Sequence, residues 1–266
     1  MSNTYGEWLK SAREAAGLTQ QELATLALMT RSHISHIEAG RRVPNEEDAR
    51  RLDMVLGTGN VLTSFRPGAE DEEVLADYFA PVRHLEQQAT TIREFALSFF
   101  PGILQTEAYA RCVLSMAFPP PTPAECDKAL VARMERATIL QNPASPVVWA
   151  ILDEGALRRP IGGPEIMAEQ IEHVIALTES RRIRTHVLPM SLGYHPLLDS
   201  MLTLMWFKDQ PPAAYSEGAR TGKLHDSPAV VEALQGRYDL ALSDAMPRDE
   251  TLAFLKATAR SYRGHG

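Results

Sequence analysis

The stretch at residues 18–42, LTQQELATLALMTRSHISHIEAGRR, constrains the fold of this chain more than any other segment. Thr19 can accept hydrogen bonds from the free N–H groups at the start of a helix, and Glu22 stands where it completes a capping box. These residues predict a helix over residues 20–27. The small Ala24 on its apolar face allows a second helix to cross closely.

A second helix is predicted after a short turn. Thr30 can cap its first N–H groups, and Gly40 can end it, because glycine adopts the left-handed conformation without strain. The helix between them covers residues 31–38, and Ile34 and Ile37 face the first helix. Two caps and a stop at these spacings predict a helix-turn-helix, a motif that binds DNA.

The outward face of the second helix carries residue types that read base edges. With the isoleucines turned inward, the helical period places Arg31, Ser32, Ser35 and His36 outward and His33 near the edge. Arg31 can contact guanine bidentately, while serine and histidine can donate or accept at base edges. Residues at the helix ends are expected on phosphates. The predicted DNA-binding residues are Gln20, Thr30, Arg31, Ser32, His33, Ser35, His36, Arg41 and Arg42.

Two other interpretations of this segment are possible. A helical hairpin can simply pack, because apolar residues at helical spacing more often form core than function. His33 and His36 stand three residues apart, as metal ligands can, but no cysteine or carboxylate lies at a ligand-like spacing. The agreement of both caps with the exposed residue types favours DNA binding, and no metal site is predicted.

The segment resembles the lambda-repressor-like, or Xre, family of DNA-binding domains over residues 5–66. In that family a Thr-Gln-x-Glu-Leu-Ala stretch precedes a recognition helix closing in Ile-x-x-Ile-Glu-x-Gly, and residues 19–24 and 34–40 match these motifs. Leu28 stands where the family often has glycine in the turn. Further helices are expected near residues 5–16 and from residue 45, with core side chains Trp8, Leu9, Ala12, Leu52, Val55 and Leu56.

Length and composition predict two domains. A chain of 266 residues that is 44% hydrophobic exceeds the usual single core. We expect an all-α helix-turn-helix domain over residues 1–66 and a mixed α+β domain over residues 67–266. No apolar run approaches the ~20 residues of a membrane span, no secretory signal is visible, and Cys112 and Cys126 form no disulfide or metal pattern. These features predict a reduced, cytoplasmic protein without a membrane segment.

The net charge of −7 lies outside the helix-turn-helix. Residues 1–66 hold eight Lys or Arg and eight Asp or Glu, so the whole excess falls on residues 67–266. An acidic body limits non-specific DNA binding and makes affinity fall steeply with salt. Because one module makes few contacts, we expect a homodimer that reads two half-sites on double-stranded DNA about one helical turn apart.

The C-terminal part alternates helical and strand patterns. After a break near residues 65–73, a helix is predicted over residues 70–93. The other predicted helices cover residues 106–116, 123–141, 164–180, 228–242 and 248–260. The predicted strands cover residues 147–152, 185–188, 201–207, 213–217 and 222–225. A crossover through the helix at 164–180 can make the first two strands parallel, and the mixture indicates an α+β class.

Roughly residues 75–260 resemble the C-terminal domain of actinobacterial regulators of the WhiJ type, an antitoxin-like group in which this domain follows an Xre module. The matching stretches are residues 101–111, 152–157, 187–189 with His195, and 215–217. Such regulators are typically found with a small protein encoded next door. The resemblance therefore implies a protein partner more than a chemical substrate.

Aromatic residues of the C-terminal domain offer an alternative, a small-effector pocket. In the loop at residues 193–196, Tyr194 and His195 place an aromatic ring beside a titratable imidazole. A structural histidine is the commoner outcome, and charged groups near buried elements usually form ion pairs. The candidate effector or partner residues are Phe99, Phe100, Tyr194, His195, Trp206 and Tyr215.

The chain carries no Gly-x-Ser-x-Gly, Gly-x-x-x-x-Gly-Lys or His-Glu-x-x-His motif, so neither catalysis nor a cofactor is predicted. The leading prediction is a sequence-specific transcriptional regulator, acting as a repressor, whose C-terminal domain receives a small protein partner. The alternative is a one-component regulator with a small-molecule effector. An enzyme carrying a DNA-targeting module is the third interpretation.

Overall fold

The computed structural model describes residues 4–66, 80–117, 120–141, 146–218 and 221–264 of the chain. The chain divides into two compact units. The first comprises Met1–Thr90 and Leu204–Gln235, and the second comprises Thr91–Thr203 and Gly236–Gly266. None of the helices in the described ranges is both long and apolar enough to cross a membrane.

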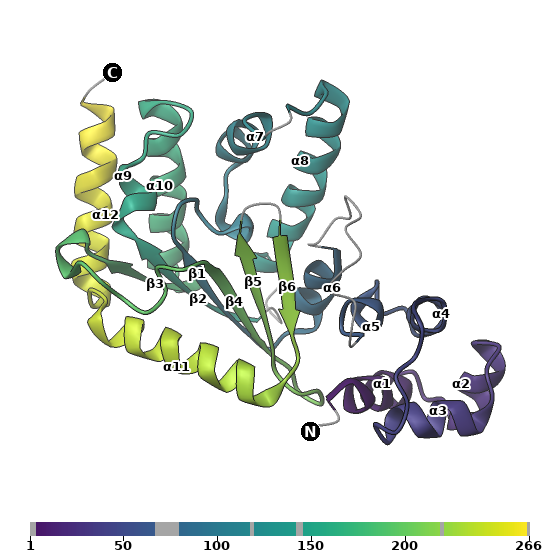
Figure 1. Ribbon diagram of the computed structural model, residues 1–266. Coiled ribbons are helices and arrows are strands. Elements are labelled where there is room, and N and C mark those ends of the chain that lie inside the picture. The colour runs from purple at the N-terminus through teal and green to yellow at the C-terminus, as the bar shows by residue number, and fades with distance from the viewer. Residues whose placement is uncertain (1–3, 67–79, 118–119, 142–145, 219–220, 265–266) are drawn as a thin grey trace. The chain divides into compact units, whose positions relative to one another are not determined.

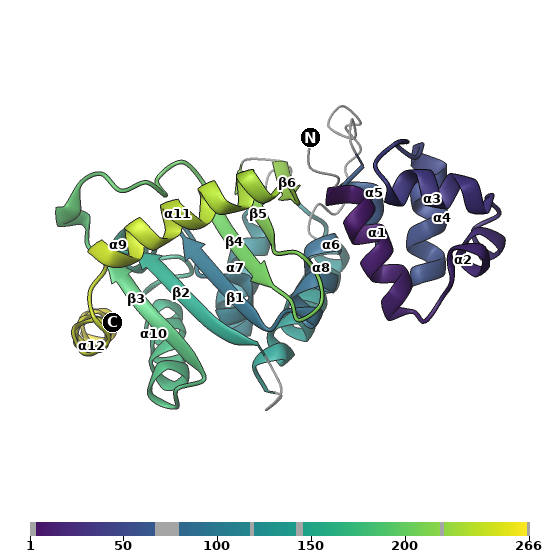
Figure 2. The same ribbon diagram turned by 90° about the horizontal axis from the view of Figure 1, so that it is seen from below.

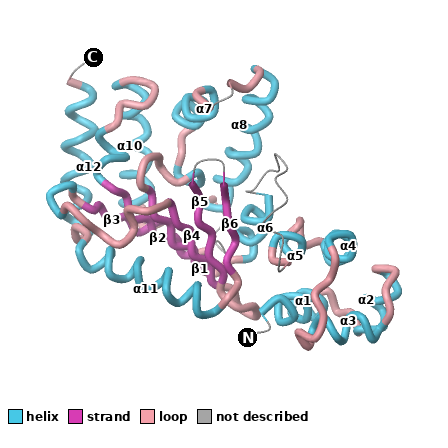
Figure 3. Tube along the Cα trace, in the orientation of Figure 1, coloured by secondary structure: helices cyan, strands magenta, loops and turns pink. Residues whose placement is uncertain are grey.

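Over residues 4–66 the N-terminal segment consists of helices joined by loops and turns, without a strand (Figure 3). Its helices are α1 (Thr4–Ala15), α2 (Gln20–Leu26), α3 (Arg31–Glu38), α4 (Glu46–Leu56) and α5 (Val61–Ser64). Each of these five helices contributes buried apolar side chains, as the helical spacing predicts. These side chains include Trp8, Leu9, Ala12, Leu23, Ile34, Ile37 and Leu52. Val55 and Leu56 were also expected in the core, but both are only half-buried.

The remainder is built on a six-stranded mixed sheet with the order β3-β2-β1-β4-β5-β6. The strands are β1 (Thr91–Ala96), β2 (Val147–Asp153), β3 (Ile183–Leu188), β4 (Met201–Trp206), β5 (Ala213–Gly218) and β6 (Thr221–His225). β1, β2 and β3 pair in parallel, whereas β5 and β6 are antiparallel. The expected α+β class and the parallel crossover between β2 and β3 are confirmed.

Seven α-helices accompany these strands in the described part of the chain after residue 79. They are α6 (Ala80–Gln88), α7 (Glu107–Ser115), α8 (Pro123–Ala137), α9 (Glu154–Arg158), α10 (Pro164–Glu179), α11 (Pro228–Asp244) and α12 (Arg248–Arg263). α10 makes the crossover between β2 and β3, and α12 packs beside it (Figure 1). The C-terminal part of α11, from residue 236 on, lies beside β1 of the same unit (Figure 2). Its Tyr238 is fully buried and lies 5.6 Å from the guanidinium of Arg93 on β1.

The predicted helix over residues 70–93 is wrong at its C-terminal end. α6 stops at Gln88, and residues 91–93 begin β1 instead, where Thr91 pairs with Val147 of β2. Helical and strand periodicities are hard to distinguish in so short a stretch, and pairing with β2 decides the outcome. Residues 67–79, which include the expected hinge and the start of that helix, lie outside the described residues.

Two smaller differences concern α8 and α9. The helix predicted to reach residue 141 ends at Ala137, and one 3-10 turn (Thr138–Leu140) follows it. α9 was not predicted, because its five residues are too few for a periodic pattern. Asp153 caps it by accepting a 2.7 Å hydrogen bond from the N–H of Gly155.

Candidate nucleic-acid interface

The first helix of the motif, α2, begins where its cap predicts. The Glu22 N–H donates to Thr19 Oγ1 at 3.2 Å, and the Thr19 N–H donates to Glu22 Oε2 at 2.7 Å, so both halves of the capping box form. The same hydrogen bonds, from the Thr19 backbone first, lower the pKa of Glu22. Leu23 and Ala24 are fully buried behind the cap. Local sequence therefore fixes both the start and the inward face of α2.

The turn between the helices keeps a left-handed residue without glycine. Leu28 has φ of +57°, and the next N–H, of Met29, donates to the Ala24 carbonyl at 2.8 Å. The Leu28 side chain is 79% exposed, so little burial offsets the strain of this conformation. The turn therefore holds a non-glycine residue in the left-handed region at a cost in free energy.

Replacing Leu28 with glycine is expected to raise the free energy of unfolding of the module by roughly 0.5 to 1 kcal/mol. The energy gained by relieving the left-handed strain is larger than the cost of the added backbone entropy of the unfolded chain. Gly17→Ala is the reverse control, because Gly17 has φ of +70° and an added Cβ meets no atom within 4 Å. Amide hydrogen exchange in α2 and α3 should slow in the first variant and accelerate in the second. Faster exchange in Leu28→Gly would contradict the assignment of strain.

The second helix, α3, is bounded as predicted. The His33 N–H donates to Thr30 Oγ1 at 3.1 Å at its start. At its end Gly40 has φ of +68°, and the Arg41 N–H donates to the His36 carbonyl at 2.8 Å. Ile34 is fully buried, as is nearly all of Ile37. The inward face of α3 is therefore confirmed.

A buried ion pair holds α3 against α1. Arg13 Nε donates to Glu38 Oε1 at 2.6 Å and Arg13 Nη2 to Glu38 Oε2 at 3.2 Å, with side chains only 10% and 6% exposed. Arg13 Nη1 also donates to the Leu18 carbonyl, and the Gln20 amide donates to Glu38 Oε2 at 2.8 Å. Hydrogen bonding to Glu38 raises the pKa of Arg13. These contacts fix the C-terminal end of α3 to the start of α2.

The outward face of α3 is accessible. Three of the predicted residues are exposed: Arg31, Ser32 and His36. Ser35 is half-buried, and the Thr30 hydroxyl accepts the capping hydrogen bond. Arg41 and Arg42 are exposed just beyond the helix. The acid of this segment, Glu38, is turned inward onto Arg13. Residues 1–66 have zero net charge overall. The exposed charged residues of α3 and its C-terminal turn, however, are arginines.

His33 lies at the edge of this face and packs toward α4. Its Nε2 is 3.7 Å from Asp48 Oδ2, and its side chain is 14% exposed. Burial lowers the pKa of His33, and the nearby Arg42 lowers it further, while Asp48 opposes both. His33 therefore helps to hold α3 against α4, and it is less available to contact bases in a DNA groove. The Gln20 side-chain amide likewise donates its hydrogen bond to Glu38.

The six C-terminal candidates are divided between the two units. Phe100 is fully buried against Tyr109, with ring centroids 5.3 Å apart. His195 is 3% exposed and lies 3.1 Å from Asp153 Oδ2, whereas its neighbour Tyr194 is 75% exposed. Phe99 is partly exposed, and Trp206 and Tyr215 stand on β4 and β5 of the other unit. The loop therefore buries His195 beside Asp153 and leaves Tyr194 accessible.

Sequence reasoning missed two buried acids that support the motif. Glu38 was assigned no partner, because Arg13 lies 25 residues away and no local pattern links them. Asp53, 4% exposed on α4, accepts hydrogen bonds from the N–H groups of Leu62 and Thr63, each at 2.8 Å. The signal available for both was an acid at an inward position of a helix.

Comparison with known families agrees with this geometry. A model described as a helix-turn-helix domain matches residues 4–64, and a model described as a domain of unknown function, DUF5753, matches residues 79–257. No curated protein and no solved structure matches the chain. The helix-turn-helix match supports a DNA-binding regulator.

Proposed function

This chain belongs to the DUF5753 family, and from that premise and the geometry of α3 we propose that it is a sequence-specific transcriptional regulator of the Xre type. The observation that carries the proposal is the exposed arginine, serine and histidine face of a helix held from behind by buried isoleucines and an ion pair. A helix presented in this way fits the major groove, where side chains can distinguish all four base pairs.

The contacts fall into two groups under this proposal. Arg31, at the first turn of α3, reads a base edge, with Ser32, Ser35 and His36 beside it. Arg41 and Arg42, beyond Gly40, contact phosphates and set the register without reading sequence. His33 and Gln20 act mainly by positioning α3 and α2, since their side chains face Asp48 and Glu38.

The regulatory part of the proposal concerns the second half of the chain. We assign it the reception of a small protein encoded nearby, on the resemblance to WhiJ-type, antitoxin-like regulators, and we assign the full chain a cytoplasmic, dimeric, repressor role without catalytic activity. Co-expression with the neighbouring gene's product should give one complex in size exclusion. Separate elution of the two proteins at micromolar concentration would remove the partner from the proposal.

Operator binding is tested by footprinting the purified full-length protein on DNA upstream of its own gene over a salt series. Protection is expected over two half-sites about one helical turn apart. The logarithm of the affinity should fall linearly with the logarithm of the salt concentration. Absence of binding to any DNA at low salt would overturn the assignment.

Two arginine variants separate base reading from phosphate contact. Arg31→Ala should cost about 1 to 3 kcal/mol of binding and relax the preference at one base pair. Arg42→Ala should weaken all sequences alike and reduce the salt slope by about one. Arg248→Ala, which removes an exposed charge from α12, is the matched control and should change neither quantity. Equal, uniform losses at Arg31 and Arg42 would contradict the docking.

A further inference from the structure

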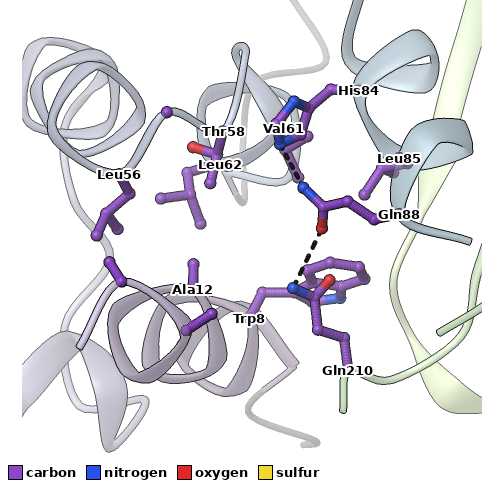
Figure 4. A pocket seen from close by; sticks show the side chains of 13 residues that line it. Trp8, Ala12, Leu56, Thr58, Val61, Leu62, His84, Leu85, Gln88 and Gln210 are labelled. Carbon is purple, nitrogen blue, oxygen red and sulfur yellow. Dashed lines mark hydrogen bonds between the residues drawn. The ribbon is translucent and has the colours of Figure 1, made fainter. Parts of the chain in front are cut away.

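A half-open cavity of about 250 Å³ lies in the first unit and is lined by residues of α1, the end of α4, α5 and α6 (Figure 4). Apolar side chains form most of its wall, among them Ala12 of α1, Leu56 of α4, Leu62 of α5 and Leu85 of α6. Dry cavities of about 150 Å³ in proteins hold benzene. This space therefore has room for a compact organic molecule.

The polar part of the wall is uncharged. Gln88 Nε2 lies 2.6 Å from His84 Nε2, and Gln210 Nε2 donates to Gln88 Oε1 at 3.4 Å (Figure 4). Burial lowers the pKa of His84, which keeps its imidazole neutral near pH 7 although Asp53 opposes the shift. The residues described as lining the cavity include no Asp, Glu, Lys or Arg. An ionised ligand would therefore lose its hydration without gaining a counter-charge.

Two buried polar atoms of the lining residues have no hydrogen-bond partner among the described residues. One is Nε1 of Trp8, a residue that is only 2% exposed. The other is Oε1 of Gln210. The indole nitrogen can only donate, and the amide oxygen can only accept. A bound acceptor would satisfy the indole N–H, and a bound donor would satisfy the amide oxygen.

We propose that this cavity binds a neutral, compact and largely apolar molecule that carries a primary amide or a hydroxyl group. The acceptor of that group takes the Trp8 indole N–H, and its donor bonds to Gln210 Oε1. Ala12 of the wall directly precedes Arg13, which holds Glu38 at the end of α3. A ligand that orders α1 therefore acts on the support of the proposed DNA-reading helix.

Benzamide is the probe that tests the site, because its amide both accepts and donates. In spectra of the ¹⁵N-labelled full-length protein, benzamide should shift the Trp8 indole N–H resonance saturably, with a dissociation constant on the order of millimolar. The Trp149 indole, on β2 of the other unit, should not move. Benzoate has the same shape with a negative charge and should bind roughly tenfold more weakly. No shift with benzamide, or equal binding of benzoate, would overturn the proposal.

Gln210→Met keeps the side-chain length, removes the amide oxygen, and should weaken benzamide about fivefold. Gln141→Met, at an exposed position in the other unit, should leave the affinity unchanged. Wild-type affinity in Gln210→Met would refute the assigned contact. Trp8→Phe, read through backbone amides of α1, gives a second test in case the first variant alters the loop. Because the assay contains no DNA, its result is independent of operator binding.

Discussion

Glu38→Ala is expected to lower the free energy of unfolding of the helix-turn-helix module by about 3 to 5 kcal/mol. The substitution leaves the Arg13 guanidinium, whose side chain is 10% exposed, without the carboxylate that accepts two of its hydrogen bonds. It also leaves the Gln20 amide without its acceptor. Breaking one side of a buried pair strands the other charge, and this penalty exceeds the net value of the intact pair.

Amide hydrogen exchange in α3 measures this loss. Amides that exchange only on unfolding of the module should accelerate by a factor of roughly 10² to 10³, since each 1.4 kcal/mol is about tenfold. Glu14→Ala is the matched control. Glu14 lies 3.4 Å from the same guanidinium but is 57% exposed, and removing it should cost less than about 1 kcal/mol. Arg13→Met with Glu38→Met should recover most of the stability. If Glu38→Ala and Glu14→Ala lowered the free energy of unfolding equally, burial would not explain the contribution of the Arg13–Glu38 pair.

The parts of the site that could be predicted from sequence are those encoded by neighbouring residues. Thr19, Glu22 and Thr30 cap helices through contacts three residues apart, and all of these hydrogen bonds are present. Ile34 and Ile37 follow from helical periodicity alone. The outward face of α3 then follows by exclusion, so its exposure could be anticipated as well.

Contacts between distant segments could not be predicted in this way. The Arg13–Glu38 pair joins residues 25 apart, and although the helical period turns Glu38 inward with Ile34, it does not identify the partner. The sequence pattern predicts a helix through residue 93, but residues 91–93 begin β1, whose strand character comes from pairing with β2, over 50 residues later. The effector candidates illustrate the same limit, since the burial of Phe100 and the 3.1 Å contact of His195 with Asp153, 42 residues away, follow only from the fold.

Asp53 supports α5 in place of a local cap. Asn60, the residue before α5, has φ of +77° and makes no side-chain cap hydrogen bond. Asp53 of α4 instead accepts from the N–H groups of Leu62 and Thr63 and from the hydroxyl of Thr63 at 2.6 Å. The hydroxyl of Thr58 donates to it as well. A single buried carboxylate thus satisfies the start of a helix of only four residues.

Asp53→Ala should therefore lower the local stability of α5 by about 3 to 5 kcal/mol, because two backbone N–H groups and two hydroxyls lose their acceptor in a buried site. Exchange of the Leu62 and Thr63 amides should accelerate by roughly 10² to 10³. Asp53→Asn keeps one acceptor oxygen and should fall between this variant and the wild type. Glu47→Ala, on the same helix with its side chain 81% exposed, should change the exchange of these amides little. Unchanged exchange in Asp53→Ala would mean that the first turn of α5 is held by its apolar contacts, Val61 and Leu62, and not by the carboxylate.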